Sequence, residues 1–292
     1  NLLKTGAAAA AGTAVAGTGV RYVEAADRAG AKYNWGHTMD FGEQYYVRIV
    51  EILESIRRNE MQLIGDISSR MAETIKKGGK VWYDAYVGHM GSYECAEENK
   101  GNPRIFVSNA KNVKYEEMKP GDVLVTNNVN EKIKAARDAG TYVVGVPVNY
   151  VDNEWTPRGF VNPNPNNWLL GDTSSVILQS YIPYHQGIVD IPEVPEMKIC
   201  PSSANSVCSL FWMFQCEVAN KLKNPKAKPV DKSAEFLDTV IGRIRDAYRL
   251  QKNYIFDAAP VVAKMIGNGA TTTARATMAA CRASPTAWRW VP

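Results

Sequence analysis

KPGDVLVTNNVNEKIKAARDAGTYVVGVPV, residues 119–148, has the most regular secondary-structure pattern in this chain. Pro120–Gly121 is typical of a turn, and DVLVT is an apolar run typical of a buried strand. The polar break NNVNE leads into the helical pattern KIKAARDAG, which Gly140 ends, and YVVGV reads as the next strand. A strand, a helix and a strand of these lengths form a βαβ unit, so this stretch predicts a parallel sheet.

The strand pattern extends upstream of this unit. VWYDAYV (81–87) reads as a buried strand that breaks into the loop GHMGSYECAEE (88–98), and a second short run, RIFVS (104–108), follows. Ligands bind parallel sheets outside the carboxyl ends of the strands. The loops Gly88–Tyr93 and Thr126–Asn130 are therefore the places where we expect a functional site.

Helical patterns flank the predicted sheet. From about Tyr45 to Lys77 apolar residues recur at steps of three and four, with a division at Asn59 and an end at Gly78–Gly79. Downstream, SSVILQSYIP (174–183) predicts another strand. The segment that follows Ser202–Ser203 predicts a helix, because both residues are natural N-caps.

A further amphipathic helix is expected around Phe236 to Tyr254. Residues 149–172 read as a long Asn/Pro-rich loop.

The N-terminal end of the chain differs from this core. Residues 1–19, NLLKTGAAAAAGTAVAGTG, have the apolar run and small-residue site of a signal peptide and are too short for a membrane span. An Ala-rich arm is the alternative. We therefore divide the chain into residues 1–19, an N-terminal arm at 20–44, a domain at 45–250 and an extension at 251–292.

Composition limits the function classes. The chain has 292 residues, of which 45% are hydrophobic and 22% charged, and a formal charge of +4 that is small for this size and disfavours nucleic acid as the main partner. Five dispersed cysteines without a C-x-x-C pair argue against a disulfide framework and a structural zinc site. There is no G-x-G-x-x-G fingerprint, so we expect no redox cofactor. We expect no metal site either.

The order of helical pair, Gly-Gly, strand, G-H loop and GDVLVTNN…EKIKAARDAGTYVVGV resembles the SIS (sugar isomerase) domain. The similarity covers about residues 45–250 and is greatest to uncharacterised SIS proteins with a G-H-S-H-M loop, whose later segments are similar to IPYHQGIVDIPEVPEMKICPSSANS. It implies an α/β three-layer sandwich with a mostly parallel, five-stranded, flavodoxin-like sheet. A helical hairpin would precede this sheet and a C-terminal helix would follow it. The opening NLLKTGAAAA likewise resembles the segment after the twin arginine of Tat signals, without the arginines, and implies an exported protein, periplasmic or extracellular.

The resemblance implies a ligand site after the strand DVLVT. SIS domains hold a sugar phosphate there in an S-x-S-G-x-T loop, where hydroxyl and backbone N–H groups meet the anion at a helix N-terminus. This chain departs from that pattern: it lacks the glycine and places the carboxylate of Glu131 nearby. The candidate ligand-binding residues are Thr126, Asn127, Asn128 and Asn130. Alternatively these are turn residues, with Asn128 or Asn130 capping the next helix.

The loop after the first strand supplies the catalytic candidates. Gly88 and Ser92 could contact a ligand, and His89 could act as a base or ligand because imidazole titrates near neutrality. SIS isomerases use a Glu on the helix after this loop to remove a proton beside a carbonyl, and Glu94, Glu97 and Glu98 are the possible counterparts. The alternative for each Glu is a solvated helix face. His185, Ser202 and Ser203 are weaker ligand-binding candidates.

Two functions follow from this reading. The first is an exported SIS-domain protein that binds a sugar derivative, a phosphosugar or amino sugar, and that could act as an isomerase or lyase by Glu or His proton abstraction without a cofactor. The second is a non-catalytic SIS-fold scaffold that forms a homo-oligomeric or filamentous assembly at the cell surface. Fold alone does not decide between them. A homo-oligomer is expected in either case.

Overall fold

The computed structural model describes residues 40–85, 103–107, 113–148, 168–183, 186–192, 198–224 and 226–267. The chain divides into two compact units, residues 1–242 and residues 243–292. The first unit contains the sheet and most of the helices. The described part of the second is the later portion of one long helix, α8 (Lys232–Gly267).

A parallel sheet forms the centre of the first unit. Its four strands, β1 (Val81–Asp84), β2 (Val123–Thr126), β3 (Tyr142–Gly145) and β4 (Val176–Ile177), lie in the order β1-β2-β3-β4. All three pairings are parallel. The α/β class and the parallel sheet are therefore confirmed, whereas the expected count of five strands is not, because the described residues form a sheet of four.

Two runs that read as extended differ from expectation: one forms no strand in the described residues, and the other forms a shorter strand. Of the run RIFVS (104–108), the described residues form no strand, although the amide of Val107 donates to the carbonyl of Val81 at 2.9 Å and so places this segment beside β1. In the run 174–183, the assigned strand is β4 alone. Tyr181 has a φ of 57°, which takes the backbone out of the extended conformation.

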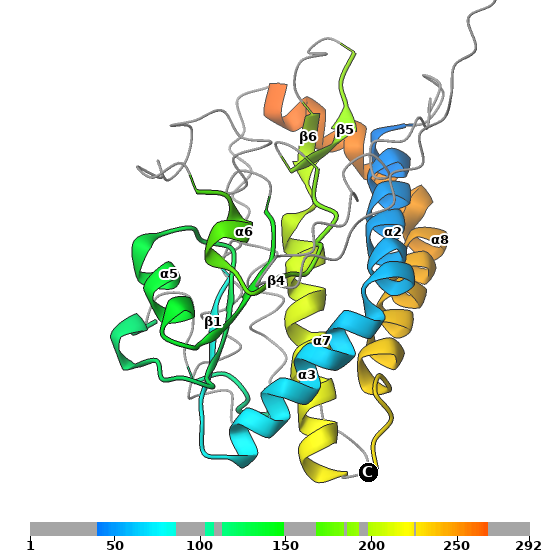
Figure 1. Cartoon of the computed structure of the whole chain (residues 1–292). Helices are drawn as coiled ribbons and strands as arrows, with labels where there is room; N and C mark the ends of the chain where they lie inside the picture. Colours follow the sequence, from blue (N-terminus) through cyan, green and yellow to red (C-terminus); the bar gives the residue numbers. More distant parts are fainter. Residues whose placement is uncertain are drawn as a thin grey trace, which may run out of the picture. The chain divides into compact units, whose positions relative to one another are not determined.

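Helices cover both faces of the sheet. Helix α5 (Glu131–Asp138) and the short α6 (Leu170–Thr173) pack on one face, and α3 (Met61–Lys76) packs against β1 and β2 on the other (Figure 1). Helix α7 (Ser203–Lys223) packs along α3.

The core follows the alternation of side chains along the strands. The buried ring of Trp82 joins a hydrophobic cluster with Leu124, Ile133 and Val143 on the α5 side. On the opposite face, the ring of Tyr83 meets that of Phe211 in α7 edge-on, with centroids 4.9 Å apart. Asp84 follows on the same face as Trp82, and it is the last residue of β1.

The helical pair before the sheet has the predicted form. Helix α2 (Phe41–Asn59) is capped by Asp40, whose carboxylate accepts from the amide of Glu43 at 2.8 Å, and α3 follows after the single residue Glu60. The predicted division at Asn59 is thus confirmed. Gly78, with a φ of 81°, ends the pair in the left-handed conformation that glycine adopts without strain.

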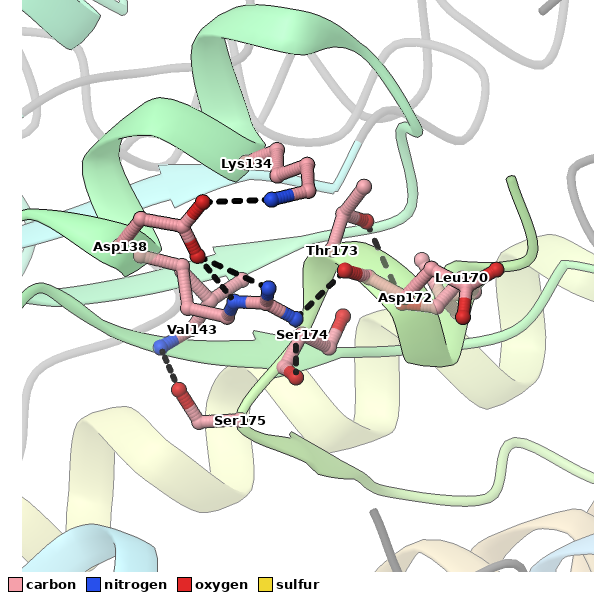
Figure 2. A network of polar contacts seen from close by, with 9 residues as sticks. Lys134, Asp138, Val143, Leu170, Asp172, Thr173, Ser174 and Ser175 are labelled. Carbon is pink, nitrogen blue, oxygen red and sulfur yellow. Dashed lines mark hydrogen bonds and ion pairs between the residues drawn. The ribbon is translucent and has the colours of Figure 1, made fainter. Parts of the chain in front are cut away.

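A polar network ties α5 to α6 near the start of β3 (Figure 2). The guanidinium of Arg137 donates to the carbonyl of Asp172 at 2.5 Å and pairs with Asp138, whose other oxygen accepts from Lys134. The hydroxyl of Ser175 accepts from the amide of Val143 at 3.1 Å. These contacts fix the end of the sheet opposite to the carboxyl ends of β1 and β2.

A two-stranded antiparallel sheet, β5 (Gly187–Asp190) and β6 (Lys198–Pro201), precedes α7.

The last helix is longer than predicted. The helix expected over Phe236 to Tyr254 is the longer α8, which continues through Pro260. None of the helices in the described part of the chain is long and apolar enough to cross a membrane.

Candidate functional site

A buried carboxylate lies at the carboxyl end of β1, where the sequence predicted a site. Asp84 is 3% exposed, and one of its oxygens accepts three hydrogen bonds. The donors are the phenol of Tyr115 at 2.5 Å, the hydroxyl of Thr126 at 3.0 Å and the side-chain amide of Asn128 at 3.1 Å. We call Asp84, Tyr115, Thr126 and Asn128 the Asp84 cluster.

The parallel register brings this cluster together. Asp84 pairs with Thr126 in the sheet, so the last residues of β1 and β2 lie side by side at one edge. Tyr115 begins the 3₁₀ helix η1 (Tyr115–Glu117), which packs against α5 on the face where Trp82 and Asp84 point. Residues distant in sequence therefore meet at the carboxyl edge of two neighbouring strands, as expected for a ligand site in a parallel sheet.

The turn after β2 is held by its own polar groups. The hydroxyl of Thr126, which donates to Asp84, also accepts from the backbone amide of Asn128 at 3.0 Å. Asn128 donates a further hydrogen bond to the carbonyl of Asp84 at 3.2 Å. Asn130 is the N-cap of α5, because its side chain accepts from the amide of Ile133 at 3.0 Å. Of the two capping candidates, Asn130 has this role and Asn128 does not; Asn127 is buried beside them.

Burial sets the electrostatics of the cluster. Loss of hydration raises the pKa of the Asp84 carboxyl, and the hydrogen bonds from Tyr115, Asn128 and Thr126 act in the opposite direction without cancelling it. Burial also raises the pKa of Tyr115, and the nearby charge of Asp84 adds to that rise. The phenol therefore stays protonated at physiological pH, while the carboxyl takes up a proton at a higher pH than an exposed Asp.

The cluster differs chemically from a phosphate-binding loop. Such a loop directs hydroxyl and amide donors at an anion. Here the donors of Thr126 and Asn128 already point at a carboxylate of the protein itself. Glu131 adds a second carboxylate in the first turn of α5. The arrangement suits a ligand that donates hydrogen bonds or is positively charged.

All four predicted catalytic residues, His89, Glu94, Glu97 and Glu98, lie outside the described residues. The same applies to three predicted ligand-binding residues, Gly88, Ser92 and His185. In the sequence Gly88 and His89 follow Asp84 by four and five residues. The structure therefore defines one of the two loops predicted to form the site, the one that begins at Thr126.

Ser202 and Ser203 belong to another part of the structure. Ser202 occupies the N-cap position of α7, as predicted, but its hydroxyl makes no capping hydrogen bond and instead donates to the carbonyl of Gln186 at 3.0 Å. Ser203 is the buried first residue of α7. The hydrogen bonds of Ser202 share no residue with those of the Asp84 cluster.

Sequence reasoning missed Asp84 and Tyr115. The available signal was an acidic residue inside the apolar run VWYDAYV, at the point where the strand ends. A charged residue is almost never fully buried without a partner, so this position implied a dedicated set of hydrogen-bond donors.

A second carboxylate–tyrosine pair lies between α2 and α3. Glu60 is 6% exposed, and it accepts from the phenol of Tyr181 at 2.8 Å and the amide of Gln179 at 3.4 Å. Burial raises its pKa as well. Glu60 links the helical pair to the segment after β4, and we assign it a structural role.

Metal ligands do not gather in the described part of the chain: no three His, Cys, Asp or Glu side chains there are placed to hold an ion. No protein-family model matches the sequence, and a comparison with curated proteins finds no match.

Proposed function

We propose that this chain binds a sugar derivative at the carboxyl edge of β1 and β2, through the Asp84 cluster and the loop that follows β1. The proposal keeps the SIS-type architecture expected from the sequence, a five-stranded flavodoxin-like sheet in a homo-oligomer. It also keeps export to the periplasm or cell surface, directed by residues 1–19.

The buried carboxylate of Asp84 is the observation that supports this most directly. A polar cluster at this edge of a parallel sheet is the common location of ligand sites. Carboxylates and amides recognise sugar hydroxyl and amino groups by accepting and donating hydrogen bonds. The cluster contains both kinds of group, and because the amide of Asn128 already donates to Asp84, a sugar would be recognised here chiefly through the carboxylate as an acceptor.

Charge favours an amino sugar, or a neutral sugar, over a phosphosugar. Two unit negative charges about 4 Å apart repel by about 4 kcal/mol at the effective dielectric constant of a protein surface. A phosphate placed against the turn after β2 would be repelled by Asp84 and would meet no unoccupied hydroxyl on Thr126, which already donates to Asp84 and accepts from Asn128. An ammonium group in that position would be attracted by a similar amount.

Catalysis as an isomerase or lyase is the more specific form of the proposal. The proton would be removed by His89 or by one of Glu94, Glu97 and Glu98. Asp84 is a further candidate, because a carboxyl with a raised pKa at such an edge is suited to proton transfer. No cofactor is required for either reaction.

One observation favours the non-catalytic scaffold as a second candidate. Asp84, Thr126 and Asn128 satisfy one another without any ligand, as residues with a purely structural role would. A scaffold of this kind would bind no sugar and would form a large ordered assembly. Light scattering separates the two cases, since a dimer or tetramer fits a binding protein and an extended assembly fits the scaffold.

Thermal-shift measurements with four ligands test the proposal: glucosamine, N-acetylglucosamine, glucose 6-phosphate and glucosamine 6-phosphate. We expect the unphosphorylated amino sugars to raise the melting temperature most. Asp84→Asn should remove the preference for the ammonium group. Glu60→Gln is the matched control, because it changes a buried carboxyl that also accepts from a tyrosine, and it should leave the shifts unchanged.

Two results would contradict the proposal. A larger shift with the phosphorylated sugars that persists in Asp84→Asn would show an anion site and a different ligand class. No shift with any of the four ligands, together with a large assembly in light scattering, would favour the scaffold.

A further inference from the structure

The helix of the second unit has an exposed apolar face. Leu250, Tyr254, Val261 and Met265 follow one another in α8 at steps of four, seven and four, which places them on one side of a helix. Their side chains are 58%, 72%, 59% and 49% exposed. Ile255 and Val262 lie beside them and are also exposed. We call these six residues the α8 apolar face.

The opposite side of this helix is basic. Helical spacing places Arg245, Arg249 and Lys252 away from the α8 apolar face, with Lys264 at its flank. Within 243–267 there are five Lys or Arg and two Asp. One of these, Asp246, is paired with Arg249 at 3.2 Å.

The charge of the whole chain is concentrated in this unit. Residues 243–292 contain eight Lys or Arg and two Asp, a net charge of +6, whereas the complete chain has +4. The first 242 residues therefore have a net charge of −2. No Asp or Glu occurs after Asp257, and the same stretch contains Trp288 and Trp290. The second unit is thus cationic and contains groups that favour a membrane interface, whereas the first unit is weakly acidic.

We propose that α8 binds the surface of an anionic lipid bilayer from residue 243 to residue 267. A helix with one apolar side and Lys or Arg on the other lies in the plane of the interface, with its apolar side among the acyl chains and its cations near the headgroups. The exposed apolar side chains and the positive charge are complementary to such a surface. Helix α8 lies on the membrane in this arrangement and does not span it.

The same observations argue against a second copy of the helix as the partner. Two copies would each bring a net charge of +3 between residues 243 and 267, so that pairing them would oppose like charges. An anionic bilayer gains from both the apolar side and the charge. Pro260 is compatible with the same orientation, because helical spacing places this exposed residue away from the middle of the α8 apolar face.

Co-sedimentation of the full chain with lipid vesicles tests this proposal. We expect binding to vesicles of phosphatidylcholine with about one third phosphatidylglycerol, and at least about tenfold weaker binding to phosphatidylcholine alone. Raising the salt from about 0.1 M to about 0.5 M should weaken binding to the anionic vesicles by about tenfold.

Two double variants separate the apolar side from the charge. Leu250→Ser with Val261→Ser should weaken binding at least about tenfold, because two large apolar groups are lost from the face that enters the bilayer. Asn253→Ser with Ala263→Ser is the matched control on the other side of the same helix and should bind like the parent chain. Circular dichroism confirms that both variants keep their helix content.

Four outcomes would overturn the proposal. Binding to neither kind of vesicle would rule out membrane binding by α8, and equal binding to neutral and anionic vesicles would exclude a role for charge. Binding that is unaffected by Leu250→Ser with Val261→Ser would show a purely electrostatic polyanion contact. A dimer of the free protein in light scattering that dissociates in this variant would assign the α8 apolar face to a second copy of the chain.

Discussion

The phenol of Tyr115 lies 2.5 Å from the carboxylate of Asp84, although 31 residues separate them in the sequence. This hydrogen bond joins a 3₁₀ helix to the carboxyl end of β1, the first strand of the parallel sheet. Asp84 also accepts from Thr126 in the neighbouring strand, so one carboxylate links three segments. The edge of the sheet at this point therefore depends on an acidic residue and its donors.

Truncating this carboxylate should be costly, whereas an amide should be tolerated. Asp84→Ala leaves the donors of Tyr115, Thr126 and Asn128 without their acceptor, and we expect it to lower the free energy of unfolding by about 3 kcal/mol. Asp84→Asn keeps an oxygen that can accept the same bonds and should cost less than about 1 kcal/mol. Urea denaturation at neutral pH measures both; equal losses would mean that the negative charge itself is required.

The pH dependence of stability should identify the raised pKa of Asp84. A carboxyl whose pKa is higher in the folded protein than its value of about 3.9 in the unfolded chain binds its proton more tightly when folded. Its contribution to stability is complete below the unfolded pKa and is lost as the pH rises through the folded pKa. The free energy of unfolding of the parent chain, minus that of Asp84→Asn, should therefore fall between about pH 4 and neutral pH.

The comparison with Asp84→Asn isolates this group. Glu60, which also has a pKa raised by burial, and the surface carboxyls are the same in both chains and cancel in the difference. A difference that instead rises with pH would mean that the hydrogen bonds to Asp84 outweigh its burial and that its pKa is lowered.

Gly145, at the end of β3, should not accept a methyl group. A Cβ at this position would lie 2.4 Å from the hydroxyl oxygen of Ser174 and 2.7 Å from Cδ1 of Ile177. Gly145→Ala should therefore destabilise the fold by about 1–3 kcal/mol through overpacking. Gly242→Ala is the control: its Cβ would have no neighbour within 4 Å, and alanine should stabilise α8 by up to about 1 kcal/mol. Thermal unfolding of both variants checks the opposite signs.

Glu217 should be essential for the connection between α7 and α8. Its fully buried carboxylate accepts from the amides of Asp231 at 3.0 Å and Ser233 at 2.8 Å, and Lys221 lies 3.7 Å away. Glu217→Ala should cost about 3–5 kcal/mol, because it leaves two amides without their acceptor and removes the carboxylate beside the buried Lys221, whose ammonium keeps the carbonyls of Lys228 and Pro229. Glu217→Gln should cost less.

A control for Glu217 lies one turn into α8. Glu235 pairs with Lys232 on the surface, where the carboxylate is 64% exposed. Glu235→Ala should leave the denaturation midpoint within experimental error, since exposed ion pairs contribute little. A similar loss for Glu217→Ala and Glu235→Ala would mean that the buried network does not stabilise the connection.

Local patterns in the sequence were sufficient for much of the fold. The unit from residue 119 to residue 148 contains its own turn, cap and periodicity, and it forms β2, α5 and β3 as predicted. The break between α2 and α3 was also visible, because Asn59 interrupts two apolar stripes. Each of these signals acts over a few residues and needs no distant partner.

Features that depend on distant contacts were not predictable in the same way. The burial of Asp84 requires hydrogen bonds from Tyr115 and Thr126, and the residues near Asp84 in the sequence do not indicate that these two are its donors. The choice of Asn130 over Asn128 as the cap depends on where β2 ends relative to Asp84, since Asn128 is engaged by that carboxylate. The extent of α8 was underestimated because Pro260 normally marks the end of a helix.

The strand order β1-β2-β3-β4 has a consequence for synthesis on the ribosome. The helices between the strands, α5 and α6, cover one face as the chain emerges, but on the other face the ring of Tyr83 is met by Phe211 of α7. A nascent chain that ends before Ser203 would have its β-strands and α3 complete, but the rings of Tyr83 and Phe106 would lack Phe211, which packs on both. Chaperone engagement during translation should therefore be greatest in the interval after β4 emerges and before α7 does.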